Sequence, residues 1–218
     1  PTDRILLHHQ AAVAWAREHR AGILPYEATQ PLPRGFDMQL APRARGAALW
    51  VKGPEGPLLL APSEAVEHAL SIRILLPNGD WAPVRGVMVH PDIPIAGLVC
   101  ADLPEDLIPL ELADASEATE GRRALHLSGL DIPAAPALNR AHLIRRALPP
   151  LARYWATDVR VPDGHPLLTP EGRLLAIAFR KMNALSTESL AAGPEVLTGL
   201  LQDLAAIAPQ LLGAVPTK

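Results

Sequence analysis

Short apolar runs separated by turn residues limit the fold of this chain more than any other feature. From residue 46 onward, six such runs follow one another closely, and most of them end at Gly, Pro, Asn or Asp. Short strands at this spacing are typical of an antiparallel β-barrel or β-sandwich. We predict strands over residues 47–51, 58–60, 71–76, 81–89, 95–100 and 107–112.

The distribution of proline supports this interpretation. The 218 residues include 24 prolines, which are spread along the chain and often flank the apolar runs. Proline fixes φ and lacks an N–H, so it suits loops and strand ends better than helix interiors. A hydrophobic content of 49% indicates a buried core rather than a disordered chain. The sequence therefore predicts an all-β globular protein.

A second group of strands and three helices complete the expected secondary structure. Further strands are predicted over residues 122–127 and 154–161, with an unassigned region between them. Residues 21–45 are rich in Pro, Gly and Arg and are expected to form an extended connection. Apolar residues recur with a helical period over residues 3–20 and 195–207, and a short helix is predicted over 63–70 with Ser63 as its N-cap.

The stretch from residue 161 to 179 contains the most informative local pattern. Glu171-Gly172 lies between two apolar runs, which is a hairpin signal. Just before the first run, Asp163 and His165 stand in a turn bounded by Pro162 and Pro166. Taken alone, this turn presents an acid and an imidazole on a loop whose backbone is restricted by two prolines.

The order of these elements resembles that of trypsin-like serine proteases of the HtrA type. The resemblance covers about residues 46 to 207 and depends on the order and spacing of the segments. The matching segments are the first hairpin and short helix (46–66), the next hairpin (72–80), the run that carries the catalytic Asp (89–99), the crossing between barrels (107–115), the nucleophile hairpin (162–177) and the closing helix from 195.

The resemblance implies two six-stranded antiparallel β-barrels with an N-terminal and a C-terminal helix. We expect an N-terminal helix and connection over residues 1–45, a first barrel over 46–118, a second barrel over 119–185 and a C-terminal helical segment over 186–218. Residues 46–207 would together form one trypsin-like domain. The family often forms trimers through its N-terminal segment, so a homo-oligomer is also expected.

Carried onto this chain, the catalytic triad is absent. The position of the histidine falls on Glu64, that of the aspartate on Pro94 and that of the serine on Asp163. A shift of one or two residues could bring in Ser63 or Asp92, but no single shift restores all three roles, which a serine protease needs together. The resemblance therefore implies a pseudoprotease.

Two further features of the sequence argue against peptidase activity. Pro162 and Pro166 remove backbone donors from the turn where an oxyanion hole would form, and His165 replaces a flexible glycine. Trp155 and Thr157 precede the turn, where the family builds the floor of its substrate pocket. A tryptophan there is expected to fill the pocket rather than admit a side chain.

The resemblance implies that Glu64, Asp163 and His165 face one another across the former cleft. Carboxylate oxygens and an imidazole nitrogen are ligands for divalent metals, so these residues form a candidate metal site. Two carboxylates could instead share a proton, with one pKa raised. The simplest alternative is that all three are solvated, and His90 could join any such site.

The remaining histidines and the single cysteine are expected to be structural. Among them are His68, His126 and His142, and the cysteine, Cys100, is predicted to be an inert buried thiol. The basic segment 140–146 is expected to be a solvated face. With one cysteine there is no disulfide framework and no thiolate zinc cluster, and no cofactor is expected.

Composition also limits the partners. The net charge of -3 argues against nucleic acid, and no run reaches the roughly 20 apolar residues of a membrane span. No signal peptide is visible, and because the chain starts at Pro1 we expect a processed or excised segment. The compartment, bacterial cytoplasm or periplasm, stays open.

Three functions follow as hypotheses. The first is a catalytically inactive trypsin-like domain that acts as a protein-binding or scaffold module. The second is a divalent-metal-binding protein that uses the former cleft. The third is a residual serine hydrolase working through a register that the resemblance does not reveal.

Overall fold

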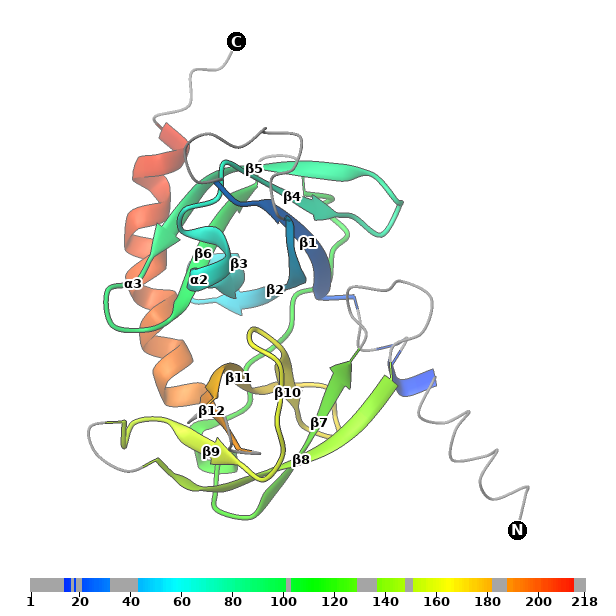
Figure 1. The fold of residues 1–218 in the computed structure, drawn as a ribbon, viewed down its shortest axis with the longest axis vertical. Coiled ribbons are helices and arrows are strands. Elements are labelled where there is room, and N and C mark those ends of the chain that lie inside the picture. The colour runs from blue at the N-terminus through cyan, green and yellow to red at the C-terminus, as the bar shows by residue number, and fades with distance from the viewer. Residues whose placement is uncertain are drawn as a thin grey trace.

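Two closed β-barrels, one above the other in Figure 1, make up most of the protein. The computed structural model describes residues 14–16, 18, 21–31, 43–100, 103–128, 137–147, 151–181 and 188–213. Each barrel has six strands, and every strand pair within them is antiparallel. The predicted all-β fold of two six-stranded barrels is confirmed.

The first barrel closes in the order β1-β2-β3-β6-β5-β4. Its strands are β1 (Ile23–Thr29), β2 (Arg43–Gly53), β3 (Gly56–Pro62), β4 (Ser71–Leu75), β5 (Trp81–Val89) and β6 (Ile95–Cys100). Five of these coincide with predicted runs. The barrel interior is filled by small and branched side chains from alternate positions of the strands.

The strand β1 was not expected, because it lies in the segment predicted to be an extended connection. Leu24, Tyr26 and Ala28 alternate into the core of the barrel, whereas Glu27 faces its outer surface. Pro25 interrupts the apolar pattern and resembles a strand breaker, although a strand tolerates it where no ladder donor is needed. The first barrel therefore begins at Ile23 and includes part of residues 1–45.

The second barrel closes in the order β10-β11-β12-β9-β8-β7. Its strands are β7 (Arg122–Ser128), β8 (Ala137–Arg146), β9 (Trp155–Thr157), β10 (Pro166–Leu168), β11 (Leu174–Lys181) and β12 (Ser189–Ala192). The region left unassigned by the sequence contains β8, and the strand predicted over 154–161 is reduced to the three residues of β9. The hairpin at Glu171-Gly172 is confirmed, since the N–H of Thr169 donates to the carbonyl of Arg173.

The run 107–112 is not a strand of either barrel. Leu110 forms a single bridge with Val51 of the first barrel, and Leu112 forms one with Leu174 of the second. The segment is apolar because it crosses between two cores, and each bridge fixes it to one of them. The prediction of a strand here was wrong, and β1 supplies the sixth strand instead.

The helices differ from prediction mainly at their ends. The short helix α2 covers only Ser63–Val66, and Pro62 rather than Ser63 occupies the N-cap position. Ala14 to Ala16 and Glu18 are helical, as predicted for residues 3–20, most of which lie outside the described residues. Within the described ranges, none of the helices combines the length and apolar character needed to cross a lipid bilayer.

The long helix α3 (Pro194–Gly213) runs along the side of both barrels, as Figure 1 shows. Leu197, Leu200, Leu201 and Leu204 are buried and belong to a hydrophobic cluster that includes residues of both barrels. Leu204 approaches β6 closely, since a Cβ added at Gly97 would lie 3.2 Å from its side chain. The helix therefore helps to fix one barrel on the other.

Candidate functional site

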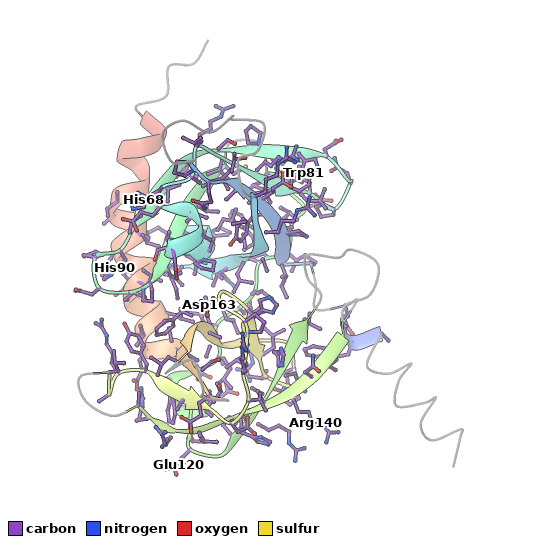
Figure 2. All side chains as sticks on the ribbon, in the orientation of Figure 1. His68, Trp81, His90, Glu120, Arg140 and Asp163 are labelled. Atoms are coloured by element: carbon purple, nitrogen blue, oxygen red, sulfur yellow. The ribbon has the colours of Figure 1, made fainter. Side chains whose placement is uncertain are left out.

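The chain segments expected to carry the triad meet between the two barrels. The N–H of Ser63, at the start of α2, donates to the carbonyl of Pro94 with a separation of 3.2 Å. The turn after Val161 reaches the same place, because a Cβ added at Gly164 would lie 2.7 Å from Cδ of Pro62. Figure 2 shows Asp163 at the boundary of the two barrels. We call this junction the crevice.

At the start of α2, Ser63 and Glu64 have different environments. Ser63 is 8% exposed and is joined to Pro94 through its backbone. Glu64 is exposed on the helix surface. The residue beside Pro94 is therefore Ser63, one position before the residue that the resemblance assigns to the histidine.

The turn that carries Asp163 is a closed backbone structure. The N–H of His165 donates to the carbonyl of Pro162 at 3.1 Å, and Gly164 has φ of +79°, the value for the third residue of a type II turn. The N–H of Gly164 donates to the carbonyl of Ala178 at 2.6 Å. Both amides are thus used by the protein itself, while the side chain of Asp163 is exposed.

His165 is oriented by the second barrel. Its Nδ1–H donates to the carbonyl of Leu127 at 3.0 Å, since a carbonyl can only accept. The neighbouring His126 is 6% exposed, and its Nδ1 has no hydrogen-bond partner among the described residues. Burial, and then the proximity of His165, lowers the pKa of His126 to about 4. His126 is therefore neutral at pH 7.

Tyr26 is a residue of this region that the sequence analysis missed. Its side chain is buried in the first barrel and lies close enough to Gly46 that a Cβ there would meet its hydroxyl at 2.8 Å. Burial, and then the charge of Asp163, raises the pKa of Tyr26 to about 12. The alternation of Leu24, Tyr26 and Ala28 was the signal that could have revealed it.

His90 stands on the loop that leads to Pro94 and holds that loop in place. Its Nδ1 accepts from the N–H groups of Asp92 and Ile93, each at 3.1 Å. Nε2 therefore carries the proton and donates to the carboxylate of Asp203 on α3 at 3.3 Å. With its basic nitrogen occupied, His90 caps the loop and is not placed to accept a proton from another group.

The second barrel also anchors this loop. Arg153 Nη2 and the hydroxyl of Tyr154 both donate to the carbonyl of Asp92, at 2.6 and 3.1 Å.

A cavity of about 410 Å³ opens between the loop and the second barrel. Its walls are partly apolar and include Ser63 from the crevice; the other lining residues are Glu67, residues 89–94, Leu151, Arg153, Tyr154, Phe179 and Leu190.

The other residues predicted from the sequence differ in their burial. Trp155 and Thr157 are both buried in the second barrel. His142 bonds to Asp158 at 2.7 Å through Nδ1, and His68 is exposed. Cys100 is half-buried rather than buried, and its Sγ donates to the carbonyl of Pro83.

The candidate metal ligands do not gather. Within the part of the chain that the structure describes, no group of three His, Cys, Asp or Glu residues is arranged to hold a metal ion. Glu64 is exposed on α2, and the Nδ1 of His165 is engaged by Leu127. The hypothesis that Glu64, Asp163 and His165 bind a metal gains no support from this geometry.

Comparison with known proteins identifies the fold. No protein-family model matches the sequence, and no curated protein matches it either. Among solved structures, the HtrA-type protease AlgW, as a serine-to-alanine variant with tripeptide, matches with a TM-score of 0.68 at 15% identity over 87% of this chain. The Rv3671c protease in an inactive form matches with a TM-score of 0.64 at 14% identity, also over 87% of this chain.

The two matches differ in how much of the other protein they cover. This chain spans 62% of that AlgW chain and 92% of the Rv3671c chain. AlgW with decapeptide gives a TM-score of 0.65 at 15% identity, with 88% of this chain and 66% of that chain covered. At these identities the similarity shows a trypsin-like double-barrel fold of the HtrA type.

Proposed function

We propose that this chain is a trypsin-like domain without peptidase activity that serves as a protein-binding module. The observation that carries the proposal is the turn at Asp163. Serine-protease chemistry needs a nucleophilic hydroxyl at this turn, an imidazole bonded to it and free backbone donors for the oxyanion. Asp163 supplies a carboxylate instead, and the N–H of Val161, two residues before it where the fold places an oxyanion donor, donates to Oγ of Ser189 at 3.0 Å.

Packing in the crevice supports the same proposal. The ring of Pro62 lies against Gly164, so the space beside the turn is occupied by the protein's own backbone and side chains. The start of α2 is thereby fixed against the turn that carries Asp163. The contact joins the first barrel to the second and favours a static junction over a reactive site.

The remaining hydroxyl in the crevice does not have the partners of a nucleophile. Ser63 is buried beside Pro94, and no hydrogen bond joins its hydroxyl to an imidazole in the described part of the chain. His90 lines the same cavity, but its Nδ1 accepts two backbone N–H groups. A serine without a general base to take its proton is a weak nucleophile at neutral pH.

The cavity beside the crevice is the surface that we assign to the partner. Its volume of about 410 Å³ suits one or two side chains of an extended peptide, with apolar walls at Leu151 and Phe179. Arg153 and Glu67 provide charges at the cavity. The solved structures of AlgW with tripeptide and with decapeptide are consistent with a peptide as the class of ligand.

The loss of activity is tested with unfolded casein and a fluorophosphonate probe, with trypsin as the active control. We expect neither cleavage of casein nor labelling of this chain, because no serine is activated. Labelling of any serine, located by peptide mass spectrometry, would show a working nucleophile and contradict the proposal.

The binding role is tested separately with an array of extended peptides. Leu151→Glu places a charge on the cavity wall and should abolish the binding of the selected peptides, whereas Ile108→Glu alters an exposed side chain that does not line this cavity. Circular dichroism confirms that both variants fold. Equal binding by the two variants would remove the cavity from the proposal, even if casein remained intact.

A further inference from the structure

A charged cluster on the outer face of the first barrel plays no part in the crevice. Glu27 of β1 is 4% exposed, and three arginines surround its carboxylate. Arg43 and Arg45 come from β2 on one side, and Arg73 comes from β4 on the other. We call these three residues the arginine cluster. Their side chains are between 45% and 62% exposed, so they cover Glu27 while remaining in contact with water.

The carboxylate orients the two closer arginines. Arg73 donates to Oε1 of Glu27 through Nε and Nη2, at 3.1 and 2.6 Å. Arg45 approaches Oε2 through the same two nitrogens, at 3.1 and 3.0 Å. Arg43 is farther away, with Nη1 at 3.4 Å from Oε1. A guanidinium has five N–H donors, and Arg45 and Arg73 use only Nε and Nη2 toward Glu27. Their Nη1 groups therefore make no hydrogen bond to this carboxylate.

The cluster has an excess of positive charge. Three guanidinium groups surround one carboxylate, which leaves two positive charges in a small area of a chain whose net charge is -3. The arginine hydrogen bonds hold the pKa of Glu27 below its usual value against the opposing effect of burial. The carboxylate therefore stays ionised at neutral pH and continues to fix the arginines.

A cavity of about 230 Å³ lies at this cluster. It is lined by Glu27, Arg43 and Arg73 together with Thr29 and Ser71, which are paired across β1 and β4. The lining thus combines guanidinium donors with two hydroxyl-bearing side chains. Trp81, labelled on the first barrel in Figure 2, lies under the Arg73 guanidinium at 4.3 Å and limits its movement.

We propose that the arginine cluster binds a phosphate monoester through its phosphoryl group. A dianionic phosphoryl group matches the two excess positive charges, and its three terminal oxygens accept hydrogen bonds from guanidinium and hydroxyl donors. Glu27 holds the arginines in place before the ligand arrives, which reduces the entropy lost on binding. The compact cavity suits one phosphoryl group, whereas nucleic acid binds along extended basic stripes.

The experiment is a calorimetric titration of the whole chain with inorganic phosphate, and then with a phosphoserine peptide, at low ionic strength and pH 7.5. We expect saturable binding of one phosphoryl group per chain. Arg43 is the arginine least tightly bound to Glu27, so it is the one to replace. Arg43→Gln should weaken the affinity by about 5- to 10-fold, because it removes one charge-assisted hydrogen bond to the phosphoryl group. The matched control Arg123→Gln removes the same charge from an exposed position on β7 and should change the affinity less than 2-fold.

The controls decide between this proposal and its alternatives. Similar affinities for phosphate and the peptide would identify the phosphoryl group as the ligand, and tighter binding of the peptide would add a peptide contact; both support the site. Binding no stronger than that of chloride, or equal loss in Arg43→Gln and Arg123→Gln, would overturn it. Binding of single-stranded DNA or anionic vesicles that phosphate does not compete with would also overturn it. Thermal denaturation confirms that both variants are folded.

Discussion

The crevice and the arginine cluster both contain a carboxylate in a region with basic side chains, but they use these groups in opposite ways. In the crevice, His90 and His165 are each engaged by backbone groups of different segments. On the outer face of the first barrel, Glu27 gathers three guanidinium groups directly. Of these two regions, it is the outer face of the first barrel, where the family resemblance gives no reason to expect a site, whose charged side chains converge.

The difference separates what the backbone positions from what the side chains can do. The backbone still brings α2, Pro94 and the Asp163 turn together, and backbone hydrogen bonds and the contact of Pro62 with Gly164 hold them there. These contacts are made by backbone groups and by the ring of Pro62. Chemistry depends on the side chains themselves, and Nδ1 of both His90 and His165 is engaged by backbone groups.

The largest effect is expected from filling the crevice. Gly164→Ala should lower the free energy of unfolding by about 2–4 kcal/mol, because it adds a clash with Pro62 to the cost of a positive φ. Gly121 has a similar φ of +76°, but a Cβ added there would meet no atom within 4 Å. Gly121→Ala should therefore cost only about 1 kcal/mol. Urea denaturation of both variants measures the difference.

Equal losses in the two glycine variants would mean that Pro62 can move away from the turn. A double variant sharpens the test: Pro62→Ala removes the ring atoms that the new Cβ would meet, so it should restore part of the stability lost in Gly164→Ala. Rescue would confirm that the two barrels are in tight contact at this point.

Acidification should separate the two regions. The folded pKa of His126 is about 4, below its ordinary value of 6.5, so the unfolded chain takes up the proton first as the pH falls. Stability is then lost below pH 6.5 and down to about pH 4, and we expect a loss of about 2 kcal/mol between pH 7 and pH 5. The pKa of Glu27 is lowered in the folded protein. Its contribution to stability is therefore lost only as the pH falls below the pKa that Glu27 has in the unfolded chain.

The measurement is the free energy of unfolding by urea at pH 7 and pH 5. His126→Leu should remove most of the dependence on pH, whereas His68→Leu, at an exposed position, should leave it unchanged. If both variants keep the dependence of the original protein, another group carries the acid sensitivity and the environment of His126 is more hydrated than the structure indicates.

The smallest effect is expected on the outer face. Glu27→Gln should lower the free energy of unfolding by about 1–2 kcal/mol, because the arginines lose their ionised partner but remain hydrated. Glu111→Gln breaks an exposed pair with Lys52 and should cost less than about 0.5 kcal/mol. Thermal unfolding at pH 7 in low and high salt compares the two. A loss in Glu27→Gln no larger than in Glu111→Gln would show that the cluster adds nothing to stability.

Local sequence patterns predicted much of the fold. The turn residues and alternating runs located five strands of the first barrel, and Glu171-Gly172 located the hairpin of the second. The same reasoning missed β1, because Pro25 masks the alternation of Leu24, Tyr26 and Ala28. It also assigned a strand to residues 107–112, because an apolar segment crossing between two cores resembles a buried strand.

For the candidate site, the sequence determined which residue types stand at the segments that meet in the crevice. Only the tertiary structure decided that Ser63 rather than Glu64 lies beside Pro94, and that the amides of the Asp163 turn donate to backbone carbonyls. Likewise, Arg45 and Arg73 reach Glu27 because β1 pairs with both β2 and β4. The physical reason is that strand pairing joins residues far apart in the chain, and a shift of one residue in register turns a side chain to the opposite face.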